Sequence, residues 1–310
     1  MSTSEHWFIG ECMAELRRAG PGLLAHSFAG DVYNTAVYFE RLSGGHRSCF
    51  VTAVGTDVLS AALLAEASAQ GLDMRHVASV PDRQPGLYWI EVDPQGERSF
   101  LYWRSQSAAR LMLDNAHYAS LRAQASSCSL LYFSGITLAI LNEERRNRLL
   151  ELAHQVKDAG GWIAFDSNYR PSLWESPHHA ARWCNAALYL CTHALVTFED
   201  EQRLHDDAYP DETLRRLLGS GIQDAVVKLG AQGCMVQTPS MAAPARIPAR
   251  EVEAIDTTAA GDSFNAAYLA SRIAGNTAEE SAQAGNELAA LVVSHRGAII
   301  DKSIDRQGKP

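Results

Sequence analysis

A regular alternation of strand and helix patterns over the C-terminal two thirds of the chain restricts its fold more than any other feature. Short apolar runs, typical of buried strands, alternate there with longer amphipathic segments, typical of helices. Strands are predicted at residues 129–135, 162–166, 194–197 and 224–229, the last with a hairpin partner at 233–237. Helices are predicted at residues 142–159, 178–187, 212–218, 261–273 and 278–293. The alternation predicts an α/β fold with a mostly parallel central sheet and helices on both faces.

The N-terminal third contains a segment of a different kind. Strands are predicted there at residues 6–16 and 49–54, and helices at 34–42 and 57–70. Residues 85–104 hold two aromatic and β-branched runs on either side of a Pro-Gln-Gly-Glu turn, which predicts a β-hairpin. Its aromatic residues suit a flap that covers a ligand.

The composition excludes several classes of protein. The chain has 310 residues, 46% of them hydrophobic, and a net charge of -9, which argues against nucleic-acid or anionic-membrane partners. No apolar run approaches the roughly 20 residues that span a bilayer, and the N-terminus lacks a signal-peptide pattern. The six cysteines are scattered and form no CxxC pair. We therefore expect a cytoplasmic protein with reduced cysteines and no zinc site.

The sharpest signal for function is the segment DTTAAGDSF at residues 256–264, which opens a predicted helix. Small residues before a helix let backbone N–H groups approach an anion, and the helix N-terminus adds partial positive charge. An acid at this place, Asp262, could accept the proton of a nucleophile beside that anion. Phosphoryl transfer needs both elements. A simple capped helix with an acidic first turn is the alternative.

This segment resembles the DTxGAGDxF signature of the PfkB, or ribokinase-like, carbohydrate kinases, with Ala259 where the family usually has glycine. The alanine is familiar in the 2-keto-3-deoxygluconate kinase branch. The resemblance implies that Asp262 is the catalytic base, and that the amides of Ala259, Ala260 and Gly261 form a phosphate-binding anion hole. It also implies a three-layer α/β/α architecture.

Further segments resemble the sugar-binding parts of the same family. The start IGECMAEL is similar to that of the same branch, GDVYN to the N-terminal glycine motif, and GERSF with YWR to the lid. The resemblance implies one kinase domain over residues 1–310, with a β lid built partly from residues 85–104. It implies sugar contacts from Gly30, Asp31, Asn34, Tyr88, Tyr102, Arg104, Arg170 and Asp262. An arginine such as Arg104 can grip a carboxylate bidentately, although a solvated surface arginine is the alternative.

Two other segments resemble the nucleotide-binding parts. DSNYRPSLW, at residues 166–174, is similar to the DxNxRxxLW segment, and KLGAQG, at residues 228–233, to the KxGxxG turn that covers ATP. The resemblance implies nucleotide contacts from Asn168, Arg170, Lys228, Gly230 and Gly233, besides the amides of the anion hole.

The metal-binding element of the family is altered in this chain. The usual NxxE reads Thr-Phe-Glu-Asp at residues 197–200, so Asp200 is the candidate ligand for Mg²⁺, with Glu199 or Glu201 as alternatives. The segment SHRGA, at residues 294–298, resembles the end of the adenine pocket. The resemblance also implies a monovalent cation near Asp256 and Gly297.

The predicted function is therefore ATP-dependent phosphorylation of 2-keto-3-deoxygluconate to its 6-phosphate, by a homo-oligomer that uses Mg²⁺. A kinase for another sugar, such as fructose or ribose, is one alternative. A non-catalytic sugar-binding regulator on the same fold is another, because a fold does not fix a function.

Overall fold

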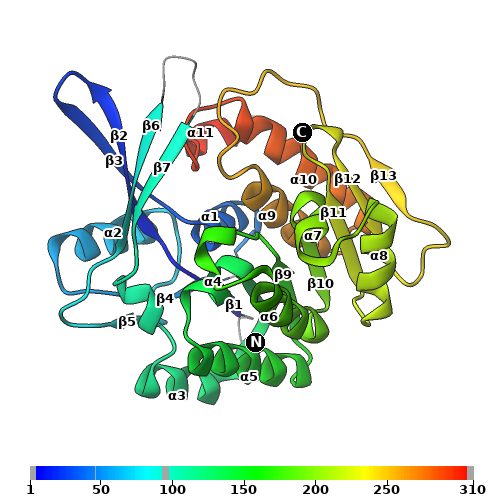
Figure 1. Cartoon of the computed structure of the whole chain (residues 1–310), viewed down its shortest axis with the longest axis horizontal. Coiled ribbons are helices and arrows are strands. Elements are labelled where there is room, and N and C mark those ends of the chain that lie inside the picture. Colours follow the sequence, from blue (N-terminus) through cyan, green and yellow to red (C-terminus); the bar gives the residue numbers. More distant parts are fainter. Residues whose placement is uncertain (1–4, 46, 93–97, 306–310) are drawn as a thin grey trace.

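The computed structural model describes residues 5–45, 47–92 and 98–305, and its middle layer is a nine-stranded sheet (Figure 1). The strand order is β13-β12-β11-β10-β9-β8-β1-β4-β5. The strands are β1 (Glu5–Ile9), β4 (Arg47–Val54), β5 (Val77–Ser79), β8 (Cys128–Ser134), β9 (Trp162–Asp166), β10 (His193–Thr197), β11 (Asp224–Lys228), β12 (Cys234–Gln237) and β13 (Ala245–Ile247). All neighbours pair in parallel except β12, which is antiparallel to β11 and β13.

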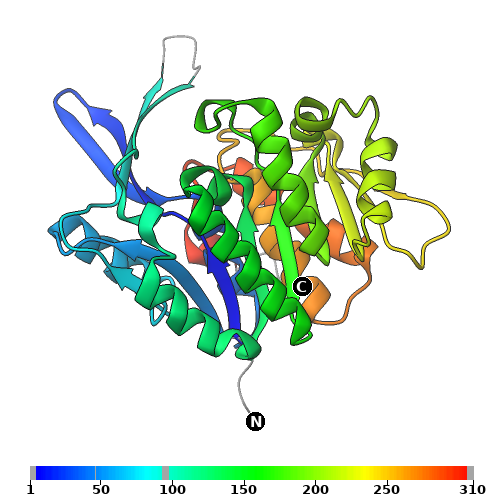
Figure 2. The same ribbon diagram turned by 60° about the horizontal axis from the view of Figure 1, so that its bottom comes forward.

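Alternate residues of each strand point to opposite sides of the sheet, and apolar residues lie on both sides. Helices therefore cover both faces. Trp7 and Ile9 of β1 belong to one apolar core, and Phe8 between them belongs to the other. The first core is covered by α3 (Asn115–Gln124), α4 (Gly135–Ile140), α5 (Glu143–Asp158), α6 (Pro177–Leu190), α7 (Phe198–His205) and α8 (Pro210–Gly219). The second is covered by α1 (Asp31–Leu42), α2 (Val58–Ala69), α9 (Ala260–Ile273) and α10 (Ala278–Val293), with the short α11 (Lys302–Asp305) near the end. Figure 2 shows the green helices in front of the sheet and the orange ones behind it, so the predicted three-layer fold is confirmed.

A separate four-stranded sheet projects from one side of the main body (Figures 1 and 2). It has the order β3-β2-β6-β7, with strands β2 (Met13–Gly20), β3 (Leu23–Ala29), β6 (Gly86–Val92) and β7 (Arg98–Trp103). The antiparallel pair β6–β7 is the predicted hairpin, whose Pro-Gln-Gly-Glu turn lies outside the described residues. The pair β2–β3 was not predicted from the sequence.

The strand predicted at residues 6–16 is interrupted in the structure. It divides into β1, in the central sheet, and β2, in the small sheet, with residues 10–12 between them. A Cβ at Gly10 would lie 2.6 Å from the Cβ of Val32, so the chain can leave the central sheet beside α1 only with a glycine at this position. The two sheets therefore meet at the end of β1.

All six cysteines are free and buried. In the part of the chain that the structure describes, no helix combines the length and apolar character needed to cross a bilayer.

Candidate active site

A cleft of about 1330 Å³ lies at the carboxyl ends of the parallel strands. This edge of an open α/β sheet gathers the residues that follow each strand. The small sheet forms one end of the cleft, and the start of α9 with the ends of β10 and β11 forms the other. Of the predicted site residues, those lining the cleft are Gly30, Asp31, Asn34, Tyr88, Tyr102, Arg104, Asn168, Arg170, Asp200, Lys228, Ala259, Ala260, Gly261 and Asp262. Gly230 and Gly233 are not among its lining residues.

The start of α9 faces this cleft. Ala259 caps the helix in the left-handed conformation, with φ of 61°. The amides of the first turn have no acceptor within a helix, so those of Gly261 and Asp262 are available to an anion. The N–H of Ala260 makes a long bond of 3.4 Å to the Thr257 carbonyl oxygen.

Asp262, in the same first turn, is buried, and its Oδ2 accepts a 2.9 Å hydrogen bond from Nδ2 of Asn34. Burial and the Asp31 carboxylate raise the pKa of Asp262, and the Asn34 amide opposes them. The predicted base and the predicted sugar loop therefore meet, although they are 228 residues apart in the sequence.

Asp31 and Asn34 lie in the first turn of α1, directly after the loop that ends at Gly30. Oδ2 of Asp31 accepts hydrogen bonds from Ser134 Oγ at 2.5 Å and from Asn168 Nδ2 at 2.9 Å. Gly30 is required because a Cβ there would lie 2.1 Å from the Glu11 carbonyl oxygen. The glycine at position 30 thus makes room for the backbone of Glu11.

Aromatic side chains of the small sheet line the opposite end of the cleft. Tyr88 is buried and donates its hydroxyl hydrogen bond to the Glu15 carboxylate. Tyr102 is 53% exposed and stacks on Phe100. Arg104 is buried and pairs with the Glu11 carboxylate.

A buried polar network lies beneath the start of α9. The ammonium of Lys228 donates to Asp166 Oδ2 at 2.6 Å and to Asn265 Oδ1 at 3.1 Å. A Cβ on Gly261 would lie 3.3 Å from that ammonium, which places its positive charge next to the amides of the first turn. Lys228 therefore adds positive charge where phosphate oxygens would bind.

Asp200, the predicted metal ligand, lies in the cleft at the start of α7. It is buried, and its Oδ2 accepts a 3.0 Å hydrogen bond from the Tyr169 N–H. Burial and the Asp166 carboxylate raise the pKa of Asp200 to about 6. Arg170 is exposed at the cleft rim and donates to the Tyr169 carbonyl oxygen.

Comparison with known proteins shows the same fold and the same kind of enzyme. The pfkB family of carbohydrate kinases matches this chain over residues 8–305. The chain belongs to that family. Over 298 residues it is 41% identical to the 2-dehydro-3-deoxygluconokinase of Haemophilus influenzae, covering 95% of each chain. It is thus a sugar kinase by family and by sequence.

Solved structures of other pfkB-family kinases superimpose on nearly the whole chain. The 2-dehydro-3-deoxygluconokinase of Thermotoga maritima has a TM-score of 0.84 over 98% of this chain and 97% of its own, at 18% identity, which shows the shared fold. The fructokinase of Vibrio cholerae O395, solved with fructose, ADP and a calcium ion, has a TM-score of 0.79 at 26% identity and covers 96% of this chain and 95% of its own.

Two loops implicated in cation binding by the family resemblance lie together. Both carboxylate oxygens of Asp256 accept backbone hydrogen bonds of 2.9 Å, one from Thr258 and one from Gly297. The monovalent cation itself stays a prediction.

Three polar residues in or beneath this pfkB-family cleft had no role predicted from the sequence. Glu11 and Asp166 line the cleft, and Asn265 lies in the buried network beneath the start of α9. Glu11 and Asp166 both stand at the carboxyl end of a strand, which is a signal that could have identified them. Asn265 follows Asp262 by one helical turn, and its Nδ2 donates to Asp166 Oδ2 at 2.8 Å.

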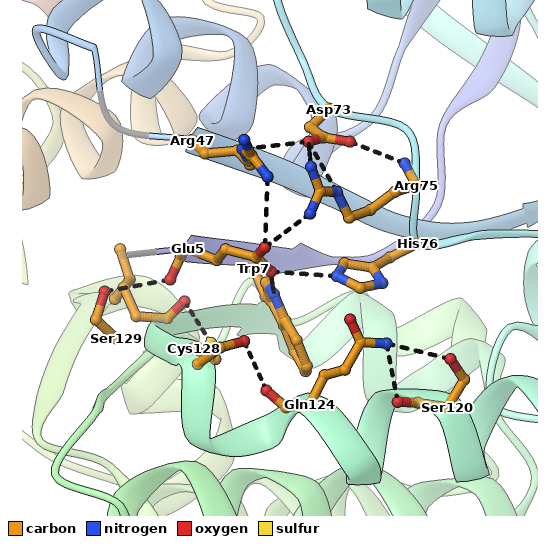
Figure 3. Close-up of polar contacts among 12 residues, drawn as sticks. Glu5, Trp7, Arg47, Asp73, Arg75, His76, Ser120, Gln124, Cys128 and Ser129 are labelled. Carbon is orange, nitrogen blue, oxygen red and sulfur yellow. Dashed lines mark hydrogen bonds and ion pairs between the residues drawn. The ribbon is translucent and has the colours of Figure 1, made fainter. Parts of the chain in front are cut away.

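Three residues whose side chains could bind a metal ion lie far from the cleft, at the amino end of β1. Donor atoms of Glu5, Cys49 and His76 lie within 4.8 Å of one another. The Glu5 carboxylate is already bonded to Arg75 and to the Trp7 indole, both at 3.0 Å (Figure 3). Because these contacts account for the buried charge, the group serves as a structural network.

Proposed function

We propose that this chain transfers the γ-phosphate of ATP to the 6-hydroxyl of 2-keto-3-deoxygluconate, the compound that is also called 2-dehydro-3-deoxygluconate. The observation that carries the proposal is the position of Asp262, at the start of a helix whose free amides face the cleft. The name of the 41% identical relative supports this substrate.

Asp262 would take the proton of the sugar hydroxyl as it attacks the phosphorus. Asn34 donates to Oδ2, so we assign the proton to Oδ1. The Asn34 bond fixes the carboxylate before the sugar arrives, and such preorganisation lowers the barrier. Asn34 lies in the first turn of α1, within the segment proposed to bind the sugar, and would thus align the base and the hydroxyl together.

The amides of Gly261 and Asp262, with the Lys228 ammonium, would hold the charge of the transferred phosphoryl group. These groups are fixed before the reaction, because Lys228 is already held by Asp166 and Asn265. Fixed donors stabilise developing charge without reorganisation. The sugar-binding and nucleotide-binding halves of the cleft would thus meet at the start of α9.

The residues in the cleft also fit a divalent cation. Asp200 and Asp166 bring two carboxylates into one buried region, and the raised pKa of Asp200 reflects its burial and then the nearby Asp166 carboxylate. Asp200 would hold Mg²⁺, which would neutralise charge on the nucleotide phosphates. The fructokinase solved with ADP and calcium supports a nucleotide and a cation in this family.

We further propose that the small sheet acts as a lid. Tyr88 and Tyr102 face the cleft from β6 and β7, and closure over the sugar would exclude water from the phosphoryl group. Arg104, at the end of β7, would bind the sugar carboxylate with its planar fork.

An ADP-release assay with a panel of sugars tests the proposal. We expect release with 2-keto-3-deoxygluconate and little release with fructose or ribose. A shift of melting temperature with the sugar acid, without ADP release, would instead identify a regulator. Preferred release with fructose or ribose would identify a kinase for a neutral sugar.

A further inference from the structure

The small sheet connects to the main body at four places, and a buried ion pair joins two of these connections. Glu11 is in the link between β1 and β2, Gly30 ends the link from β3 to α1, Gly86 begins β6, and Arg104 follows β7. Arg104 donates from Nη2 to Oε2 of Glu11. Glu11 is 2% exposed and Arg104 is 9% exposed. The ion pair therefore joins the first and the last of these connections.

Packing fixes the position of Glu11 between the other two connections. A Cβ on Gly86 would lie 2.8 Å from Oε1 of Glu11 and 3.2 Å from the Cβ of Arg104. A Cβ on Gly30 would lie 2.1 Å from the Glu11 carbonyl oxygen. Glycine at both positions thus leaves just enough room for Glu11 to reach Arg104.

The guanidinium of Arg104 retains donors beyond the one that Glu11 engages. In the described residues, Nε of Arg104 is buried without a hydrogen-bond partner, as is Oε1 of Glu11. Both side chains line the cleft, and the guanidinium lies 5.9 Å from the centroid of the Tyr102 ring. A buried donor without a partner requires an explanation, and beside this cleft an acceptor from a ligand would supply one.

We propose that Glu11 is a positioning residue that holds the Arg104 guanidinium ready for the carboxylate of an acidic sugar. This rests on the proposed function, in which Arg104 binds that carboxylate. A free arginine loses rotamer freedom when it binds an anion, and a partner that already fixes it removes this cost from substrate binding. Glu11 thereby contributes to the preference for acidic over neutral sugars.

Charge alone predicts the opposite effect. The Glu11 carboxylate repels a second carboxylate, so if its charge dominated, a neutral residue at this position would lower the KM for the sugar acid. If positioning dominates, that KM rises. The direction of the change therefore separates the two physical effects.

The test compares Glu11→Ala, Glu11→Gln, Arg104→Gln and the double variant Glu11→Ala/Arg104→Gln. We expect Glu11→Ala to raise the KM for 2-keto-3-deoxygluconate about tenfold or more and to leave the KM for ATP within about twofold. Glu11→Gln keeps an oxygen acceptor and should raise the sugar KM less. In the Arg104→Gln background, Glu11→Ala should add nothing, because its effect acts through Arg104.

The matched control is Glu91→Ala. It removes another glutamate–arginine pair of the small sheet, in which Arg18 Nε lies 3.2 Å from Oε1 of the half-exposed Glu91. Glu91 is not among the residues that line the cleft, so the sugar KM should not change. A sugar KM that Glu11→Ala leaves unchanged or lowers, or effects of Glu11→Ala and Arg104→Gln that add, would overturn the proposal.

Two further measurements separate an effect on sugar positioning from a loss of folding and from a loss of turnover. Circular dichroism shows whether Glu11→Ala folds; if it does not, Glu11→Gln alone must raise the sugar KM. Calorimetric titration with 2-keto-3-deoxygluconate measures binding without turnover. Binding that depends on Glu11, without ADP release, would reject the kinase function and retain the positioning role, whereas no binding by the wild-type protein would reject both.

Discussion

Burial of the Asp262 carboxylate lowers the stability of the folded protein, although the position of this residue suits the proposed role of general base. Burial and the Asp31 carboxylate raise its pKa in the folded protein. A carboxyl group with a raised folded-state pKa contributes stability below its unfolded pKa, and this contribution is lost as the pH rises through the folded pKa. A general base must nevertheless be ionised to act.

Replacing Asp262 with asparagine should therefore separate activity from stability. We expect kcat to fall by about a hundredfold to ten-thousandfold, because the base is lost. We expect the melting temperature at pH 8 to stay the same or rise, because a neutral amide replaces a buried carboxylate. A coupled ADP assay and a thermal melt measure the two effects, and turnover like that of the wild type would exclude Asp262 as the base.

Ala259 carries local backbone strain at the start of α9. Its φ of 61° belongs to the left-handed region, where a residue with a Cβ is disfavoured by about 1–2 kcal/mol. Glycine removes this strain, but it also increases the conformational entropy of the unfolded chain, which costs about 0.4–1 kcal/mol of stability. We expect Ala259→Gly to raise the free energy of unfolding by about 0.5–1 kcal/mol, measured by urea denaturation. A loss of stability would show that the alanine is not strained.

At the scale of secondary structure, the two faces of β7 have different environments. Tyr102 and Trp103 are neighbours with similar exposure, 53% and 58%. Because side chains alternate along a strand, Tyr102 faces the cleft, opposite Tyr88, whereas Trp103 pairs with Leu87 on the other face. The proposed lid should therefore use only one of these two aromatic rings.

Alanine substitutions at these two positions test the lid. Tyr102→Ala should raise the KM for the sugar roughly tenfold, because closure would no longer bury an aromatic ring on the ligand. Trp103→Ala is the matched control and should leave that KM unchanged. Neither should lower the melting temperature much, since both rings are largely exposed. Equal effects on the sugar KM would argue against the cleft-facing role of the sheet.

At the scale of the whole molecule, the buried His193 and the partly buried His205 link the stability of the fold to pH. Burial lowers the pKa of His193 to about 4, against the attraction of Asp224, and lowers that of His205 to about 4 as well. Both folded-state values lie below the unfolded value of about 6.5. The stability that comes from the neutral rings is thus fully present above about pH 6.5 and is lost as the pH falls towards 4.

Denaturation of the wild type and of His193→Gln at several pH values tests this linkage. Between pH 6.5 and 4 the free energy of unfolding of the wild type should fall by up to about 3 kcal/mol because His193 becomes protonated. That of the variant should fall correspondingly less over the same range. His154→Gln is the control, because the His154 side chain is 62% exposed. Parallel curves for the wild type and His193→Gln would contradict the assignment.

Local pattern was sufficient for most of the central fold but not for the small sheet. The strand at Trp162–Asp166 and the helix at Ala278–Val293 have the predicted bounds. The short helices α4 and α7 escaped prediction because each follows a strand directly, without a turn between them. Strand β3 escaped because most of its residues are exposed, so its sequence lacks the alternation of a half-buried strand.

The sequence by itself determined the layered α/β fold and the family, because strand and helix periodicity and the DTTAAGDSF segment are encoded by neighbouring residues. Only the tertiary structure decided which side chains meet in the cleft. Asn34 reaches Asp262 across 228 positions, and Glu11 reaches Arg104 across 93. The first pair depends on the packing of α1 against α9, and the second on how the two sheets meet at the end of β1. No local pattern carries that information, because a contact between distant residues is made by the packing of the elements that hold them.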